Sequence, residues 1–147
     1  MSKSIEIFID GASRGNPGLS GIGVVFFENK KIVKELYKFI GETTNNIAEY
    51  TALIYALQEA LINRYEQITV KSDSELLVKQ VNGDYKVKNK GIKPYYEQYL
   101  HLLRGFKGII VVHIPRKENS SADKLANKAI DSRLDSSFKT KEEASLF

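Results

Sequence analysis

The sequence predicts an α/β protein whose core is a mixed five-stranded sheet flanked by helices. Two observations support this fold class. Roughly the first 40 residues contain short runs in which apolar and polar side chains alternate, as is typical of β-strands. Beyond them, segments with apolar residues at helical spacing alternate with short apolar runs. A strand meander followed by strand–helix–strand units gives three antiparallel strands and then two parallel ones.

Three strands are expected in the N-terminal part of the chain. The first is predicted at 5–10, where isoleucine occupies every second position, and it is expected to end at Asp10. The apolar runs 21–28 and 31–41 lie on either side of a turn at 28–31. These two runs are therefore expected to form a hairpin.

The rest of the chain predicts four helices and two strands. The first helix is expected to begin at the polar segment 43–46 and to bury an apolar stripe that ends at Leu61. Gly83 is expected to end the second helix, and Pro94 suits the first turn of the third. The remaining elements are predicted as strands at 67–73 and 108–114 and as helices at 74–82, 94–104 and 122–130.

Length and hydropathy indicate one folded domain without a membrane segment. The 147 residues are enough for a domain with a buried core, which we expect at 1–131. The apolar pattern lapses after it, so 132–147 is expected to be a flexible tail. No apolar run approaches the roughly 20 residues that span a bilayer, and the N-terminus lacks the apolar region of a signal peptide. We therefore expect a cytoplasmic protein with no membrane partner.

The residue types narrow the possible chemistry. The chain has no cysteine, which excludes disulfides and thiolate metal sites, and it has only two histidines. A metal site would therefore consist of carboxylates, which favour Mg²⁺ or Mn²⁺. The net charge of +4 and the pI near 9.1 are compatible with an anionic partner such as nucleic acid.

Four acidic residues lie where predicted elements begin or end. Asp10 and Asp73 end strands. Glu49 lies in the first turn of the long helix, and Asp123 opens the last helix. Sites in α/β sheets are commonly built at such strand ends and helix starts. Four carboxylates gathered there would repel one another unless cations lay between them, and two Mg²⁺ ions would balance the charge.

Each acid also has a purely structural interpretation. Glu49 could belong to a capping box at 46–49, and Asp123 could stabilise a helix N-terminus through the helix dipole. Asp73 could cap the helix that follows it, and Asp10 could bind local backbone in a turn. The spacing of the four residues leaves both interpretations open.

Four segments of the chain follow one another in a recognisable order: "FIDGASRGNPG", "TTNNIAEYTAL", "VKSDSELLVKQVNG" and "RKENSSADKLANKA". Together they resemble the type 1 ribonuclease H family, in a short form without that family's basic protrusion. The resemblance covers about residues 4–131 and implies a ribonuclease H-like fold. It also implies an endonuclease that hydrolyses the RNA strand of RNA–DNA hybrids with two Mg²⁺ ions, for which Mn²⁺ can substitute. The products would carry 5′-phosphate and 3′-hydroxyl ends.

By this resemblance, the four acids are both the metal ligands and the catalytic residues. Asp10 would bridge the two ions, Asp73 would hold the ion on the nucleophile side, and Asp123 the ion on the leaving-group side. Glu49 would coordinate on the substrate side and contact a ribose 2′-hydroxyl, the group that distinguishes RNA from DNA. The resemblance further implies substrate-binding positions at Gly11, Asn16, Thr44, Asn45, Asn46, Ser74 and Asn119. Lys86, Lys88, Arg116 and Lys117 are expected as further substrate contacts because of their positive charge.

The chain departs from the family pattern in two places. The loop 114–119 lacks the histidine of well-studied members, while His113 lies on the preceding strand and is interpreted as mainly structural. Arg116 or Lys117 is the expected phosphate contact in its place. The chain has no tryptophan, and a short lysine-rich connector at 82–96 occupies the region where many members grip the hybrid. This connector could follow phosphates or be only a solvated loop.

The remaining expectations concern partners and alternative functions. A weaker grip on the hybrid would extend the substrate range to double-stranded RNA. The ending "EEASLF" resembles peptides that bind replication sliding clamps, with Leu146 and Phe147 as the contacts. We expect a monomer. Two other functions are considered: a non-catalytic nucleic-acid-binding module that retains the fold, and a strand-transfer enzyme of the same fold. The presence of all four acids favours the nuclease over the binding module. Strand-transfer enzymes usually carry extra DNA-binding domains, for which 147 residues are expected to leave no room.

Overall fold

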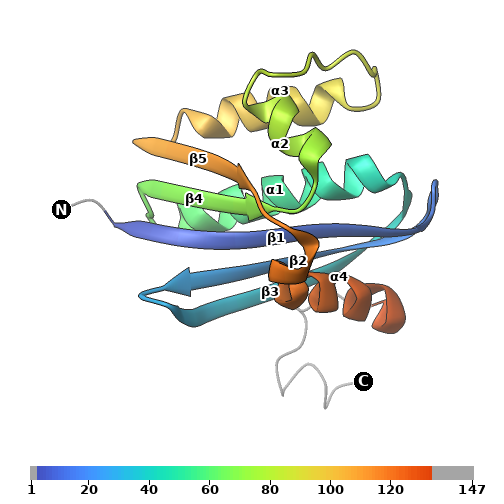
Figure 1. Cartoon of the computed structure of the whole chain (residues 1–147), viewed down its shortest axis with the longest axis horizontal. Coiled ribbons are helices and arrows are strands. Elements are labelled where there is room, and N and C mark those ends of the chain that lie inside the picture. Colours follow the sequence, from blue (N-terminus) through green and yellow to red (C-terminus); the bar gives the residue numbers. More distant parts are fainter. Residues whose placement is uncertain (1–2, 134–147) are drawn as a thin grey trace.

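The computed structural model describes residues 3–133 (Figure 1). Over this range the strands and helices follow the predicted order. The elements are β1 (Ser4–Gly15), β2 (Gly18–Glu28), β3 (Lys31–Thr43), α1 (Asn45–Ile62), β4 (Gln67–Ser72), α2 (Glu75–Val81), α3 (Lys93–Leu103), β5 (Gly108–His113), the 3-10 helix η1 (Arg116–Glu118) and α4 (Ser120–Ser132). Within residues 3–133, no helix combines the length and the hydropathy that spanning a membrane requires.

The predicted boundary between domain and tail falls at the end of α4. This helix runs to Ser132, so residue 131 lies inside its last turn. The predicted tail, with Leu146 and Phe147 as sliding-clamp contacts, continues beyond Arg133 and lies outside the described residues. The clamp interaction therefore stays a prediction.

The five strands form one sheet in the order β3-β2-β1-β4-β5. β1 pairs antiparallel with β2, and β2 pairs antiparallel with β3. β4 runs parallel to β1, and β5 runs parallel to β4. This arrangement confirms the predicted mixed sheet of three antiparallel strands and two parallel ones.

β1 is longer than the sequence pattern predicts, and Asp10 lies in its middle. The prediction that the strand ends at Asp10 is wrong. The length of β1 is set by its pairing with neighbouring strands and not by the alternation of apolar and polar residues in its own sequence. β2 continues to pair with β1 as far as Gly15, whereas β4 pairs with it only as far as Ile9. Asp10 is therefore the first residue of β1 beyond its parallel partner.

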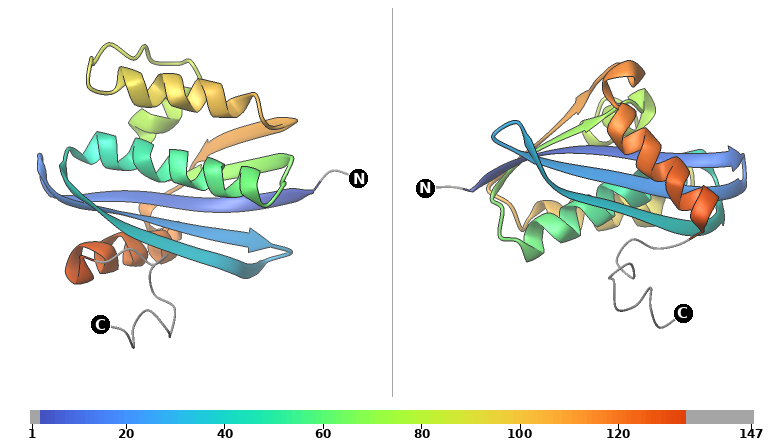
Figure 2. Two further views of the ribbon diagram at one scale, coloured as in Figure 1. Left: turned by 180° about the vertical axis from the view of Figure 1, so that it is seen from behind. Right: turned by 90° about the horizontal axis from the view of Figure 1, so that it is seen from below.

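Helices cover both faces of the sheet (Figure 2). α1 packs on one face against β1 and has α3 beside it, while α4 crosses β1, β2 and β3 on the other. Ile9, Leu53 and Leu57 are completely buried in the core between the sheet and α1. On the opposite face α4 approaches β2 closely, since a Cβ at Gly23 would lie 2.1 Å from the carbonyl oxygen of Ala122. This packing places the N-terminus of α4 beside the middle of β1.

Candidate active site

The parallel pairing of β1 with β4 brings Asp10 and Asp73 together. Ile9 and Ser72 form the last pair of this register, and the two aspartates follow them directly. Because parallel strands run in the same direction, both residues emerge at the same edge of the β1–β4 pair. The two strands thus contribute one carboxylate each to a common site.

Glu49 reaches the same place from α1. The helix is capped by Thr44, whose Oγ1 accepts a hydrogen bond from the N–H of Ile47 at 3.2 Å. Glu49 therefore lies in the second turn and not the first. Its Oε1 accepts a hydrogen bond of 2.7 Å from the N–H of Gly11 on β1. The capping-box interpretation is wrong, because the side chain crosses to the sheet instead of turning back to Asn46.

The absence of a side chain at Gly11 allows α1 to come this close to β1. A Cβ at this position would lie 2.2 Å from the carbonyl carbon of Ala48 and 2.4 Å from the backbone nitrogen of Glu49. Atoms at those distances would overlap, so any larger residue would push the helix away. Gly11 therefore sets the separation between the strand that carries Asp10 and the helix that carries Glu49.

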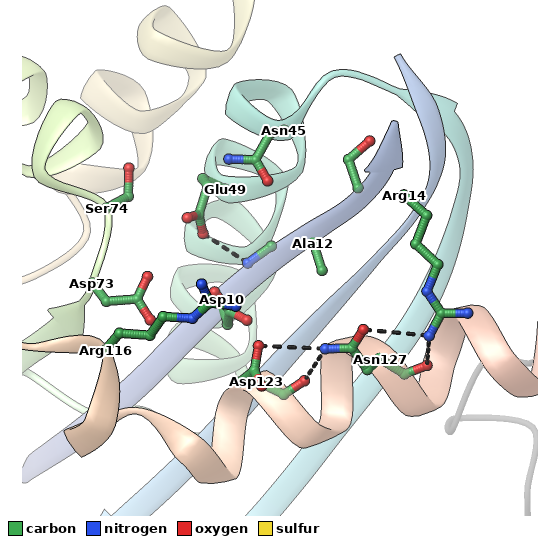
Figure 3. A pocket seen from close by; sticks show the side chains of 12 residues that line it. Asp10, Ala12, Arg14, Asn45, Glu49, Asp73, Ser74, Arg116, Asp123 and Asn127 are labelled. Carbon is green, nitrogen blue, oxygen red and sulfur yellow. Dashed lines mark hydrogen bonds between the residues drawn. The ribbon is translucent and has the colours of Figure 1, made fainter. Parts of the chain in front are cut away.

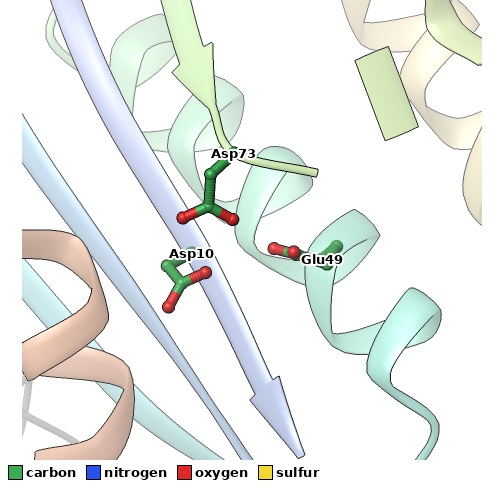
Figure 4. A group of neighbouring side chains, drawn as sticks. All are labelled: Asp10, Glu49 and Asp73. Atoms are coloured by element: carbon green, nitrogen blue, oxygen red, sulfur yellow. The ribbon is translucent and has the colours of Figure 1, made fainter. Parts of the chain in front are cut away.

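Asp10, Glu49 and Asp73 form a compact group of carboxylates (Figure 4). Each can present one oxygen atom such that the three oxygens all lie within 4.8 Å of one another. Asp10 is 6% exposed and Glu49 is 4% exposed, while Asp73 is half-buried. Three carboxylates this close at the end of a sheet are arranged as ligands of a shared cation would be.

Asp123 approaches the group from the opposite side, in the first turn of α4 (Figure 3). It does not belong to the group of three, but its carboxyl group lies close enough to hydrogen-bond with that of Asp10. Its Oδ1 also accepts a hydrogen bond of 3.3 Å from Nδ2 of Asn127. The four predicted acids therefore converge on one place, from two strands and two helices.

This environment disfavours negative charge on the two most buried acids. Burial raises the pKa of Asp10 from 3.8 to about 9, and the carboxylates of Glu49, Asp73 and Asp123 act in the same direction. Burial also raises the pKa of Glu49 to about 8, although the hydrogen bond from Gly11 opposes this change. Among residues 3–133, none of the four acids forms a salt bridge with a lysine or arginine. Over the described part of the chain, no ion pair balances their charge.

Asn119 holds Asp73 in place. The interpretation of Asp73 as a helix cap is wrong, because Ser74 caps α2 by accepting a hydrogen bond of 3.2 Å from the N–H of Leu77. Asp73 instead accepts a hydrogen bond of 3.0 Å from Nδ2 of Asn119, which also donates to the carbonyl oxygen of Ile9 at 2.8 Å. Asn119 is buried, so it links the start of α4 from inside to β1 and to the residue that follows β4.

An open hollow of about 420 Å³ lies over the four acids (Figure 3). Of the predicted substrate contacts, Gly11, Asn45, Ser74 and Arg116 line it. Asn16 lies beside it, with Oδ1 accepting a hydrogen bond of 3.1 Å from the N–H of Asn45. Polar donors and the guanidinium groups of Arg14 and Arg116 therefore surround the carboxylates, as a phosphate-bearing substrate would require.

The other predicted substrate contacts do not line this hollow. Thr44 serves as the cap of α1, and the buried Oδ1 of Asn46 has no hydrogen-bond partner within the described chain. Lys117 is exposed on η1. Lys86 and Lys88 are exposed in the connector between α2 and α3, where Lys86 borders a second hollow of about 450 Å³. Their contacts with substrate stay predictions.

Four residues that line the hollow escaped the sequence reasoning: Ala12, Ser13, Arg14 and Asn127. Arg14 belongs to the part of β1 that the pattern assigned to a turn. Asn127 follows Asp123 by one helical turn, a spacing that could have identified it. His113 shares a strand face with the buried Val111, as predicted, but β5 ends there and its side chain is exposed. The interpretation of His113 as mainly structural stays a prediction.

Comparisons with known proteins agree with this geometry. Residues 8–129 match the Reverse transcriptase-like family. Ribonuclease HI of Halobacterium salinarum is 39% identical over 128 residues, which cover 86% of this chain and 64% of that protein. A bifunctional protein of Mycobacterium tuberculosis is 38% identical over 134 residues, which cover 90% of this chain and 37% of that protein.

A solved structure shares both the fold and much of the sequence. The structure of LC11-RNase H1 in complex with an RNA/DNA hybrid matches with a TM-score of 0.84 and 42% identity, covering 88% of this chain and 98% of that chain. This chain spans less than two thirds of the length of the two curated relatives, but nearly all of the solved domain. Sheet order, acid cluster and sequence matches together show that the chain belongs to the type 1 ribonuclease H family.

Proposed function

We propose that this chain is a metal-dependent endonuclease that hydrolyses the RNA strand of RNA–DNA hybrids. The observation that carries the proposal is the convergence of Asp10, Glu49 and Asp73 within 4.8 Å, without a lysine or arginine paired to any of them in residues 3–133. Membership of the ribonuclease H family supports the reaction class. LC11-RNase H1, a relative, was solved with an RNA/DNA hybrid, which supports the substrate class.

The residues of the site fit divalent cations. All the charged donors are carboxylate oxygens, which suit Mg²⁺ or Mn²⁺. In the proposed arrangement Asp10 faces two cation positions, with Asp73 at the one on the nucleophile side and Asp123 at the other. Two such ions, when bound, activate a water molecule for in-line attack at phosphorus and stabilise the departing 3′ oxygen. The raised pKa values of Asp10 and Glu49 support the proposal, because a bound cation would stabilise the ionised form of both acids.

The protein's own side chains would bind and orient the RNA strand. Arg116 extends into the hollow and can pair with a phosphate through its planar donors. Glu49 lies on the α1 side, where a ribose 2′-hydroxyl would distinguish RNA from DNA. Asn45 and Ser74 add neutral donors on the same side of the hollow. Lys86 and Lys88 are proposed to follow phosphates further along the duplex.

Cleavage of a hybrid with a labelled RNA strand tests the proposal. The full chain and its Asp73→Asn variant are compared in Mg²⁺, in Mn²⁺ and in EDTA, with a double-stranded RNA of the same sequence as a second substrate. We expect cleavage of the RNA strand alone, with either metal and not in EDTA, and a loss of at least about 100-fold in the variant. Glu35→Gln, which removes one charge from an exposed acid of β3, should cleave like the parent protein.

The same assay separates the alternatives. A chain that binds the hybrid but never cuts it with either metal would be a non-catalytic binding module, and the proposal would be wrong. Equal cleavage of hybrid and double-stranded RNA would support the broader substrate range that the short connector predicts. Strong preference for the hybrid would exclude that range.

A further inference from the structure

Asp123 is the acid that lies apart from the group of three, and its position depends on α4 instead of the sheet. We infer that Asn127, held in turn by Arg14, is the positioning residue that orients Asp123 toward Asp10 and so completes the cation site. This inference deepens the proposed function and rests on it for the identity of the cation. Neither residue belongs to the acid cluster itself.

Asn127 binds Asp123 at two points. Its Nδ2 donates to the carbonyl oxygen of Asp123 at 3.0 Å and to the carboxylate Oδ1 at 3.3 Å (Figure 3). The two residues are four apart on one helix, so both lie on the same helix face. With Oδ1 engaged by the amide, rotation of the Asp123 carboxyl group is restricted, and the group stays on the face of α4 that lies toward Asp10 (Figure 3).

Arg14 binds the oxygen atom of the Asn127 side-chain amide. Its Nη2 donates to Oδ1 of Asn127 at 3.3 Å and to the carbonyl oxygen of the same residue at 3.4 Å. The same nitrogen forms a salt bridge of 2.7 Å with Asp131, one turn further along α4. Arg14 belongs to β1, the strand that carries Asp10. The contacts therefore connect α4 to β1 and fix the separation between Asp123 on the helix and Asp10 on the strand.

The chemistry of the neighbours leaves Asn127 one orientation. A guanidinium group only donates hydrogen bonds and an ionised carboxylate only accepts them, so the amide must turn its oxygen to Arg14 and its nitrogen to Asp123. Alanine or leucine could make neither bond, and aspartate would face Asp123 with a second negative charge. A lysine would pair with Asp123 and compete with a cation for it. Asparagine orients the carboxylate and leaves its charge available.

Loss of this support should weaken the cation position on the Asp123 side. Groups that orient metal ligands without touching the metal typically change metal affinity by 10- to 100-fold when they are removed. Because Asn127 acts through one oxygen of a partly exposed acid, we expect the lower end of that range. The protein fold should be little affected, since Asn127 is only half-buried.

Mn²⁺ binding to the full-length protein, without substrate, tests the inference directly. Free Mn²⁺ is measured by electron paramagnetic resonance for the parent protein, Asn127→Ala, Asn127→Leu and the control Ser121→Ala, which alters an exposed residue of the same helix. We expect both Asn127 variants to weaken Mn²⁺ binding about tenfold and the control to match the parent. Unchanged affinity in both Asn127 variants would overturn the inference.

Kinetics add a measurement that a merely structural role would not change. In both Asn127 variants the Mg²⁺ concentration for half-maximal cleavage should rise by a similar factor, while the KM for the hybrid stays the same. A higher KM with unchanged Mg²⁺ dependence would place Asn127 in substrate binding and refute the positioning role. If the parent protein binds Mn²⁺ but does not cleave, the proposed function fails, and the binding measurement alone decides the inference.

A double-mutant cycle tests whether Arg14 acts through Asn127. Arg14→Ala alone should weaken Mn²⁺ binding, but less than Asn127→Ala does. When both substitutions are combined, the effect should equal that of Asn127→Ala, because the removed link can be lost only once. Additive effects would show that Arg14 acts independently and would overturn this part of the inference.

Discussion

Replacing Asp10 by asparagine is expected to stabilise the metal-free protein while it abolishes cleavage. Asp10 is buried, and three other carboxylates surround it, so its ionised form is costly in the absence of a cation. Asparagine has nearly the same shape and no charge. The substitution therefore removes the repulsion without opening a cavity in the fold.

The size of the effect follows from the pKa of Asp10. In the unfolded chain the group ionises near pH 3.8, whereas in the fold it keeps its proton up to about pH 9. Between these values the folded state binds more protons, so the free energy of unfolding falls as pH rises, by about 1.4 kcal/mol per pH unit. At pH 7 the accumulated cost is at most roughly 4 kcal/mol. We expect Asp10→Asn to recover about 2–4 kcal/mol at this pH and much less near pH 4.

Urea unfolding, followed by circular dichroism in EDTA at pH 5.5, 7.0 and 8.5, measures the effect. The parent protein should lose stability across this range, and Asp10→Asn should lose less. Glu35→Gln provides the control for removing a surface charge. A second series at a Mg²⁺ concentration of 100 times the Kd should cancel most of the difference at pH 7, because the cation stabilises the parent by about 2.7 kcal/mol and the variant hardly at all.

Two results would refute the reasoning. One is a parent protein whose stability in EDTA is independent of pH from 5.5 to 8.5. The other is an Asp10→Asn variant that is no more stable than the parent at pH 8.5 without metal. Either would mean that the four carboxylates do not repel one another in the folded protein, and the electrostatic case for cation binding would then fall.

Three further changes have defined outcomes. Asn119→Ala leaves a strand carbonyl and a carboxylate without their donor, so urea unfolding should show a loss of about 2–4 kcal/mol. Gly11→Ala would place a methyl group 2.2 Å from the backbone of α1, and thermal unfolding should show a destabilisation of at least about 3 kcal/mol. If Lys86 and Lys88 contact phosphates, replacing both by alanine in the Asp10→Asn background should reduce the salt dependence of hybrid binding by about two charges. An unchanged slope in fluorescence anisotropy would assign these lysines to a solvated loop.

Local patterns predicted the order of the elements and marked four acids at their ends, and the resemblance to a known family assigned these acids their role. Helical spacing and turn residues are properties of neighbouring positions, so they can be read without knowing the partners of each segment. Asp10 and Asp73 follow apolar runs, and the order of strands and helices implies that these runs pair in parallel. Asp123 follows a helix start in the same way. The sequence therefore predicts that these acids meet, and the structure brings them together.

Contacts between distant segments could not be predicted in this way. Several side chains at 43–46 carry an oxygen atom that could cap α1. Which of them does so depends on how the helix packs against β1 at Gly11, and in the structure it is Thr44. The extension of β1 past Asp10 depends on its pairing with β2. Arg14 lies 113 residues from Asn127 in the chain, so no local pattern connects them. The four acids can be identified from the sequence, but the groups that orient them can be identified only from the three-dimensional structure.

These orienting groups share a property that explains how the site can be stable and still bind cations. Glu49 is held by a backbone N–H, Asp73 by the amide of Asn119, and Asp123 by the amide of Asn127. A lysine or arginine in any of these places would hold the carboxylate more strongly, but it would also neutralise the charge that a cation needs. Neutral donors fix the direction of each carboxylate and leave its negative charge uncompensated. The cost is that burial and the mutual repulsion of the carboxylates raise the pKa of Asp10. Stability without metal and affinity for metal are therefore opposed in this site, and substituting lysine for Asn127 should raise the first while it lowers the second.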